Sequence, residues 1–259
     1  MEGLKTALVT GASRGIGESF ARQLAAQGMD LILVARAEDR LQELAAELSA
    51  AHGVGAHVVA CDLSVAGAAN QVWAETERLG LEVDLLVNNA GVGRQGPFAE
   101  LDHDFQAAMV RLNVDTVVEM TRLYLPAMRA RRRGGIINVA SNAAFQPVPY
   151  LAVYAASKAF VLHFSEALAE EVGPDGVWVM ALCPGPTDTS FWNVAGLWQE
   201  QRGWMTPPEK VVSSGLRAFR RRRAFFVPGL VWAILAFAAS RLGPRWLVRR
   251  IAGRFFRFG

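Results

Sequence analysis

The sequence predicts an α/β fold, in which one doubly wound parallel β-sheet is covered by helices on both faces. Two observations carry this prediction. Over the first 185 residues, short apolar runs rich in Val, Ile and Leu alternate with longer amphipathic stretches, as in chains that place a crossover helix after each strand. The apolar runs are also nearly continuous, which indicates strands that are buried on both faces.

The strands and helices follow from these runs in chain order. The predicted strands cover residues 4–10, 30–35, 56–61, 83–87, 135–141, 177–183 and 224–227. The predicted helices run from the turn after the first strand to residue 28, and then over 38–52, 65–79, 105–133, 151–172 and 209–223. Pro126 lies inside the fourth of these helices, and we expect a kink or an interruption there because proline removes a backbone hydrogen bond.

Composition favours a folded cytoplasmic protein. Hydrophobic residues make up 52% of the chain, which is enough for a sizeable core, and two cysteines are too few for a disulfide scaffold. The four histidines show no metal-ligand spacing, so no metal site is expected. The N-terminus enters a strand within a few residues, and we therefore expect no cleavable signal peptide.

Charge divides the chain into an acidic body and a basic tail. Residues 1–200 hold 14 Lys and Arg against 23 Asp and Glu, whereas residues 201–259 hold 13 against a single acid, Glu209. We expect one domain over residues 1–229, with a substrate loop at about 186–208, and a C-terminal amphipathic basic extension over 230–259. Within residues 201–259 the longest uncharged run covers 17 residues, 224–240, which is short of the roughly 20 apolar residues that span a bilayer.

A glycine-rich loop follows the first predicted strand and leads into the first helix. Its sequence from Thr10 to Gly17 is TGASRGIG. A pyrophosphate needs backbone N–H donors at a helix N-terminus and no Cβ in its way, and glycines supply both. We therefore expect a Rossmann fold that binds a dinucleotide; the alternative is an ordinary turn between a strand and a helix. The expected phosphate-binding residues are Gly11, Ser13, Arg14, Gly15, Ile16 and Gly17.

Two arginines suggest which dinucleotide binds. An acid that holds both ribose hydroxyls is typical of NAD sites after the second strand, but this chain has Ala35 and Arg36 there and no acid before Glu38. The guanidiniums of Arg14 and Arg36 suit a 2′-phosphate. We predict NADP(H) rather than NAD(H); the alternative is that Arg36 is a solvated residue at the start of a helix.

The pair Tyr154 and Lys158 carries the predicted chemistry. Spacing of four residues places a phenol and an ammonium one helical turn apart on one face. A nearby cation lowers the pKa of a phenol, which is ordinarily near 10. Tyr154 would then serve as an acid or a base in a carbonyl and alcohol interconversion; the alternative is an accidental surface pair.

Taken together, these motifs resemble the short-chain dehydrogenase/reductase family. The resemblance covers about residues 4–190 and is specific because its pieces occur in order on the expected elements. Those pieces are the Thr10–Gly17 loop, Asp62, Asn88–Gly91, Asn113, Ser141, Tyr154 with Lys158, and Pro184 with Gly185.

The resemblance implies a role for each matched residue. Tyr154 would transfer the proton, Ser141 would bind the substrate oxygen, Lys158 would bind the nicotinamide ribose and tune the phenol, and Asn113 would hold a water that links Lys158 to solvent. The remaining implied cofactor contacts are Asp62, Leu63, Asn89, Ala90, Gly91, Pro184, Gly185 and Thr187. A purely structural role for Asn88–Gly91, as a turn that stabilises the central strands, stays open.

The substrate is expected to be an apolar ketone or its alcohol, because the loops beyond the strand ends are rich in aromatic and aliphatic residues. Loops of this kind set substrate choice in such folds. The expected lining residues are Phe98, Phe145, Pro147, Tyr150, Phe191, Trp192, Leu197, Trp198, Trp204 and Met205.

The tail has three open interpretations: peripheral membrane contact, a lid over the substrate cleft, and a subunit interface. On a helical wheel, Leu247, Val248, Ile251, Ala252 and Phe255 share one face, opposite Arg245, Arg249, Arg250, Arg254 and Arg257. A basic amphipathic helix of this kind suits a lipid interface. The run of arginines from 220 to 223 would assist, or would simply favour a helix C-terminus.

The sequence therefore predicts an NADP(H)-dependent oxidoreductase, a carbonyl reductase or alcohol dehydrogenase. The alternative is a non-catalytic nucleotide-binding scaffold with a membrane-interacting tail. Nucleic-acid binding is not expected, because large apolar residues are dense among the tail arginines. A sugar-nucleotide epimerase is disfavoured because the chain has no extra substrate domain. The resemblance also implies homo-oligomers formed through the helices that bear Asn113 and Tyr154.

Overall fold

The computed structural model describes residues 3–191, 195 and 205–256. A seven-stranded sheet with the order β3-β2-β1-β4-β5-β6-β7 forms its centre, and all six neighbouring strand pairs are parallel. The strands are β1 (Thr6–Thr10), β2 (Asp30–Ala35), β3 (Ala56–Ala60), β4 (Leu85–Asn88), β5 (Gly134–Val139), β6 (Val177–Leu182) and β7 (Phe225–Phe226). The predicted doubly wound fold is confirmed.

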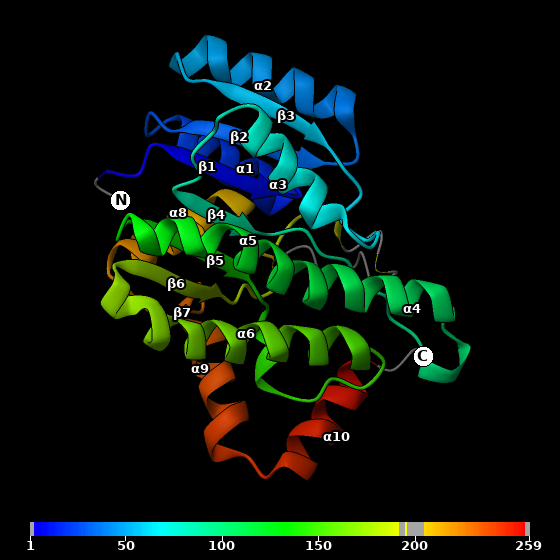
Figure 1. Cartoon of the computed structure of the whole chain (residues 1–259). Helices are drawn as coiled ribbons and strands as arrows, with labels where there is room; N and C mark the ends of the chain where they lie inside the picture. Colours follow the sequence, from blue (N-terminus) through cyan, green and yellow to red (C-terminus); the bar gives the residue numbers. More distant parts are fainter. Residues whose placement is uncertain (1–2, 192–194, 196–204, 257–259) are drawn as a thin grey trace.

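Helices cover both faces of this sheet (Figure 1). The side chains of β1 show why both faces need cover: Ala7 and Val9 enter one core, whereas Leu8 enters the other, because successive residues of a strand point in opposite directions. The first core is closed by α1 (Gly15–Ala25), α2 (Glu38–His52) and α8 (Pro208–Arg220). The second is closed by α3 (Ala68–Arg78), α5 (Thr116–Ala130) and α6 (Ala152–Val172).

The long helix predicted over 105–133 is interrupted, but not at proline. It consists of α4 (His103–Val110), a π-helical turn at Arg111–Asp115, and α5, which contains Pro126 without a break. Pro126 is exposed, on the side of a helix where water can bond a carbonyl that lacks its partner. The expected interruption at Pro126 is therefore wrong, while a kink there stays a prediction; the irregular turn instead surrounds Asn113, as π-turns often do at functional residues.

The tail continues from β7 as two helices. These are α9 (Leu230–Phe237), which runs on into a π-helical turn at Ala238–Leu242, and α10 (Arg245–Phe256). They form a V below α6, at the end of the molecule farthest from α2 and β3 (Figure 1). Within the described ranges, no helix combines the length and apolar character that a membrane crossing requires.

The parallel sheet fixes where a site can form. All strands place their carboxyl ends at one edge, so the loops that follow them meet there. The chain winds from β1 outward to β3 and then returns to β4 beside β1. Neighbouring connections thus leave the sheet in opposite directions at β1 and β4, and a crevice opens between them.

Candidate active site

A cavity of about 1590 Å³ lies at this carboxyl edge. It is larger than the roughly 300–1,000 Å³ typical of a single small-ligand site, and it therefore has room for a dinucleotide together with a substrate. Every catalytic or cofactor-binding residue predicted from the sequence lines this cavity, with two exceptions, Gly17 and Asn113. Gly17 and Asn113 instead contact the segments of the chain that line the cavity.

The absence of a side chain at Gly17 lets the glycine-rich loop lie close against the first helix. A Cβ at this position would overlap the backbone of Gly11, its carbonyl oxygen included. Gly11 and Gly15 have φ of +65° and +60°, a region that residues with a Cβ avoid. The loop can therefore pass close to the start of α1 at Gly15, where the first backbone N–H groups of a helix have no partner within it. This cradle fits a pyrophosphate.

Thr10 and Asn89 join this loop to the one that follows β4. The Thr10 hydroxyl donates to the Val87 carbonyl (3.2 Å) and accepts from the backbone N–H groups of Asn89 and Ala90 (2.9 Å each). The Asn89 amide donates to the Thr10 carbonyl at 2.8 Å. Asn89 and Ala90 therefore line the cavity and also fix the two central loops, so both interpretations of this turn have support.

Arginines surround the region beyond β2. Arg36 Nη1 lies 3.7 Å from Asp62 Oδ2, and the Arg36 side chain is 67% exposed. Burial raises the pKa of Asp62, but hydrogen bonds from Ser64 and the charge of Arg36 outweigh it, so the net shift is downward. Arg14 and Arg40 line the same region. Sequence reasoning missed Arg40; the available signal was a second arginine in the first turn of the helix that follows Arg36.

Tyr154 and Lys158 project from the first turns of α6. The Lys158 Nζ lies 5.9 Å from the centre of the Tyr154 ring and donates to the Val139 carbonyl at 2.8 Å, at the end of β5. Ser141 follows that strand; its hydroxyl accepts from the Ala143 N–H at 3.1 Å and is near enough to the Tyr154 phenol to lower its pKa. Three elements distant in sequence thus bring a hydroxyl, a phenol and an ammonium together.

Burial sets the protonation of this group. It raises the pKa of Tyr154, against a smaller lowering by the hydrogen bond with Ser141, and it lowers the pKa of Lys158 to about 8. The expectation that the ammonium lowers the phenol pKa is wrong for this arrangement, because loss of hydration dominates. At neutral pH the phenol keeps its proton and the amine keeps its charge, so Tyr154 is suited to donate a proton.

Asn113 serves as a backbone clamp. It is fully buried; its carbonyl oxygen accepts from the Val92 N–H (3.0 Å), and its amide donates to the Val92 carbonyl (2.9 Å) and the Ser157 hydroxyl (3.1 Å). The side chain is thus committed to protein groups. The role implied by the family resemblance, holding a water with this residue, stays a prediction and would fall to its backbone carbonyl.

The other end of the cavity is apolar, and its lining differs in part from the prediction. Phe191 and Met205 line it as expected, and Phe191 packs 5.5 Å from the Tyr154 ring, centre to centre. Phe98, Phe145, Pro147 and Tyr150 do not line it; Phe145 packs on Phe225 instead, with 6.1 Å between ring centres. Trp192, Leu197, Trp198 and Trp204 lie outside the described residues.

The tail supplies much of the remaining apolar wall of the cavity. In the sequence analysis, a lid over the substrate cleft was one of three interpretations of the tail. The tail residues that line the cavity are Trp232, Leu235, Ala238, Ala239, Gly243, Leu247, Val248, Ile251 and Ala252. Trp232 lies so close to Gly185 that a Cβ there would be 2.7 Å from its ring. The absence of a side chain at position 185 therefore lets the tail seat against the cofactor edge of the site.

Comparisons with known proteins agree with this geometry. A model of the short chain dehydrogenase family matches residues 5–200. The very-long-chain 3-oxoacyl-CoA reductase of Homo sapiens is 36% identical over 252 residues, which cover 95% of this chain and 77% of that protein.

Solved structures are similar over nearly the whole chain. A short-chain dehydrogenase from Sphingobium yanoikuyae in complex with NADPH has a TM-score of 0.84 at 32% identity, covering 91% of this chain and 93% of that one. A 7β-hydroxysteroid dehydrogenase has a TM-score of 0.87 at 29% identity, covering 96% of each chain. The matched family model spans the glycine loop, the serine and the tyrosine–lysine pair, and the chain therefore belongs to the short-chain dehydrogenase family.

Proposed function

We propose that this protein is an NADP(H)-dependent carbonyl reductase that acts on apolar ketones. The observation that carries the proposal is that Ser141, Tyr154 and Lys158 line the same cavity as the glycine cradle, its arginines and the apolar residues of the tail. Burying the Lys158 ammonium costs hydration free energy, and a non-catalytic scaffold would gain nothing in return.

The chain's own residues provide the proton and stabilise the negative charges that develop during reduction. Bound NADPH supplies a hydride to the carbonyl carbon. Tyr154 donates its proton to the carbonyl oxygen, and the Ser141 hydroxyl stabilises the negative charge that develops on that oxygen. The Lys158 ammonium stabilises the phenolate that remains. The apolar wall excludes water, which strengthens each of these interactions.

The cofactor is NADP(H). Arg36 is exposed at the cavity rim and Arg14 lines the same region, so two guanidiniums are available for a 2′-phosphate. Similar proteins support this assignment, since one solved relative is described in complex with NADPH and another with 5-hydroxy-NADP.

The substrate is a ketone on a long apolar body, with a fatty 3-oxoacyl thioester as the first candidate. The chamber beyond Tyr154 is walled by Phe191, Met205 and the tail helices, and it offers a chain-like substrate apolar contact over its length. Relatives named very-long-chain 3-oxoacyl-CoA reductase cover 95% of this chain. A steroid ketone is the second candidate, supported by the structural likeness to a 7β-hydroxysteroid dehydrogenase.

Replacing Tyr154 by Phe tests the proposal. The variant should lose at least about 100-fold in kcat for reduction, the scale of a lost general acid, while NADPH binding measured by fluorescence stays within a few fold. Tyr150→Phe is the matched control, because Tyr150 does not line the cavity. If wild-type protein consumes no NADPH with a panel of acyl and steroid ketones, or if Tyr154→Phe keeps full activity, the scaffold alternative holds.

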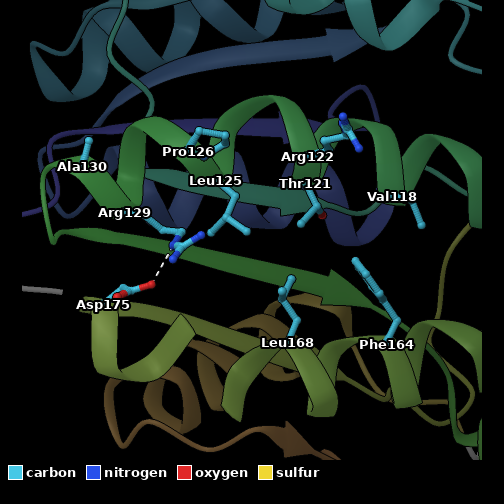
Figure 2. A pocket seen from close by; sticks show the side chains of 10 residues that line it. All are labelled: Val118, Thr121, Arg122, Leu125, Pro126, Arg129, Ala130, Phe164, Leu168 and Asp175. Atoms are coloured by element: carbon cyan, nitrogen blue, oxygen red, sulfur yellow. Dashed lines mark hydrogen bonds and ion pairs between the residues drawn. The ribbon is translucent and has the colours of Figure 1, made fainter. Parts of the chain in front are cut away.

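We also propose a homo-oligomer built on α5 and α6. A groove of about 650 Å³ runs between these helices (Figure 2), and Leu125, Phe164 and Leu168 give it an apolar floor. The Arg129–Asp175 ion pair, 2.6 Å, closes one end. Phe160, which is 41% exposed, stacks on Phe164 beside the groove. A second copy that places its own Phe160 in this groove would make a self-complementary contact of the kind that symmetric dimers use. We also propose a cytoplasmic location.

A further inference from the structure

The helix α9 has one buried side and one apolar side that faces outward. Trp232, Ala233 and Ala236 pack into the body of the protein. The opposite side carries Leu230, Ile234 and Phe237, which are 77%, 56% and 58% exposed. These three residues, the apolar stripe, recur at helical spacing on one line. A stripe of large, exposed apolar side chains usually marks a binding surface.

Arginines flank the apolar stripe. Arg241 lies one turn beyond Phe237, and Arg245, Arg249, Arg250 and Arg254 follow on α10; all five are exposed. We call them the arginine collar. The sequence has no acid from residue 230 to the end, and in the stretches that the structure describes none of the five forms an ion pair with another part of the chain. Arg250 packs over the ring of Trp246, 5.6 Å from its centre, an aromatic that is itself 53% exposed.

We propose that the apolar stripe and the arginine collar dock on the surface of an anionic lipid bilayer. Apolar side chains enter the boundary between headgroups and acyl chains, while arginines beside them contact anionic headgroups. The body of the protein carries an excess of acids over residues 1–200 and is repelled by the same surface, so the tail end faces the lipid. The V of α9 and α10 projects from the end of the molecule that this orientation requires (Figure 1).

The other side of the same helices explains what docking achieves. Leu235 of α9 and Leu247, Val248 and Ile251 of α10 line the substrate cavity. The apolar side of α10, for which the sequence left membrane contact, a lid and a subunit interface open, therefore lines the site, and the lipid-facing apolar residues belong mainly to α9. Docking places the cavity wall at the bilayer surface, so that a ketone with a long apolar body enters from the lipid. Only this route of entry rests on the proposed function; docking itself does not.

A bilayer fits the surface better than a second copy does. A symmetric dimer would bring the five arginines of one collar against five identical ones, with no acid in either tail to offset them. Nucleic acid would match the arginines but would leave the apolar stripe without a partner. An anionic membrane satisfies both features at once.

Vesicle binding by the full-length protein tests the inference. We expect it to co-sediment with phosphatidylcholine vesicles that contain a quarter phosphatidylglycerol, and much less with phosphatidylcholine alone. Each arginine near an anionic leaflet contributes roughly a fivefold gain in partitioning, so Arg249→Gln with Arg250→Gln should weaken binding roughly 30-fold. Phe237→Ser should weaken it at least about tenfold, because the ring loses its place in lipid.

The chain offers matched controls for both changes. Arg221→Gln with Arg223→Gln removes the same charge from the arginine run after α8. That run lies at the opposite edge of the sheet, where Arg222 stacks 3.6 Å from the ring centre of Trp178 at the start of β6. Val65→Ser removes an apolar side chain that is 57% exposed on the body. Both controls should bind vesicles as wild type does.

Three outcomes would overturn docking: no preference for anionic vesicles, equal losses in the tail and control variants, or a dimer by light scattering that the tail variants convert to monomer. Reduction of a short, water-soluble ketone should be unchanged in every variant. If vesicle binding follows the expected pattern while no ketone is reduced, the proposed function fails and docking stands. If ketones are reduced but vesicles are not bound, docking fails alone.

Discussion

Replacing the buried Lys158 by Met should abolish activity and leave the fold at least as stable at neutral pH. Lys158 is 5% exposed, and burial lowers its pKa from 10.5 to about 8. One pKa unit corresponds to about 1.4 kcal/mol, so below pH 8 the folded protein bears a cost of about 3 kcal/mol for holding this ammonium out of water. Met has a similar length and no charge, and it removes that cost together with the bond to the Val139 carbonyl.

The pH dependence gives the sharper measurement. Between pH 8 and 10.5 the unfolded chain keeps the proton of Lys158 while the folded chain has released it. The unfolded state then binds more protons, so the free energy of unfolding rises with pH. Wild type should gain about 2 to 3 kcal/mol relative to Lys158→Met between pH 7 and pH 10.

Urea unfolding of both proteins at several pH values measures this difference. Groups that titrate alike in the two proteins contribute equally to both free energies of unfolding, so their contributions cancel in the difference. The comparison should be repeated in a Tyr154→Phe background, because the phenol ionises in the same range. Parallel stability curves for the two proteins would refute the reasoning, since they would show that Lys158 titrates in the folded state as it does in water.

Three further outcomes are expected. Arg36→Asp should shift the ratio of kcat/KM for NADPH over NADH towards NADH by at least about tenfold, because a bidentate contact to the 2′-phosphate is lost; an unchanged ratio would assign that contact to another residue. Phe160→Glu should convert an oligomer to monomer in light scattering, whereas Val65→Glu, at a similarly exposed apolar position, should not. Reduction should hold steady below pH 8 and slow above it as Lys158, whose pKa is about 8, loses its charge; a rate that rises through pH 9 would contradict this.

The sequence alone was enough to predict the sheet, the position of the glycine loop and which residues lie together at the candidate site. Strands that are buried on both faces leave continuous apolar runs, and parallel strands bring the residues after each run to one edge. Ser141 and Tyr154 could therefore be assigned to one site although they belong to different elements. The spacing of Tyr154 and Lys158 likewise follows from helix geometry, which is local.

Only the tertiary structure decided how these groups behave. The direction of the Tyr154 pKa shift depends on how much water the surrounding loops exclude from the phenol. No local sequence pattern indicates that degree of burial. Asn113 clamps the backbone at Val92 because a π-turn, absent from the periodicity, directs it inward.

In the tail, too, the sequence determined some features and the tertiary structure determined others. Its sequence determines that α10 is amphipathic, with arginines opposite aliphatic residues, since side-chain spacing along a helix is fixed by 3.6 residues per turn. Which side meets the protein depends on where the chain leaves β7 and on contacts such as Trp232 with Gly185. Those contacts join residues far apart in sequence, and so packing, rather than periodicity, turned the aliphatic side of α10 towards the cavity and the apolar stripe of α9 towards solvent.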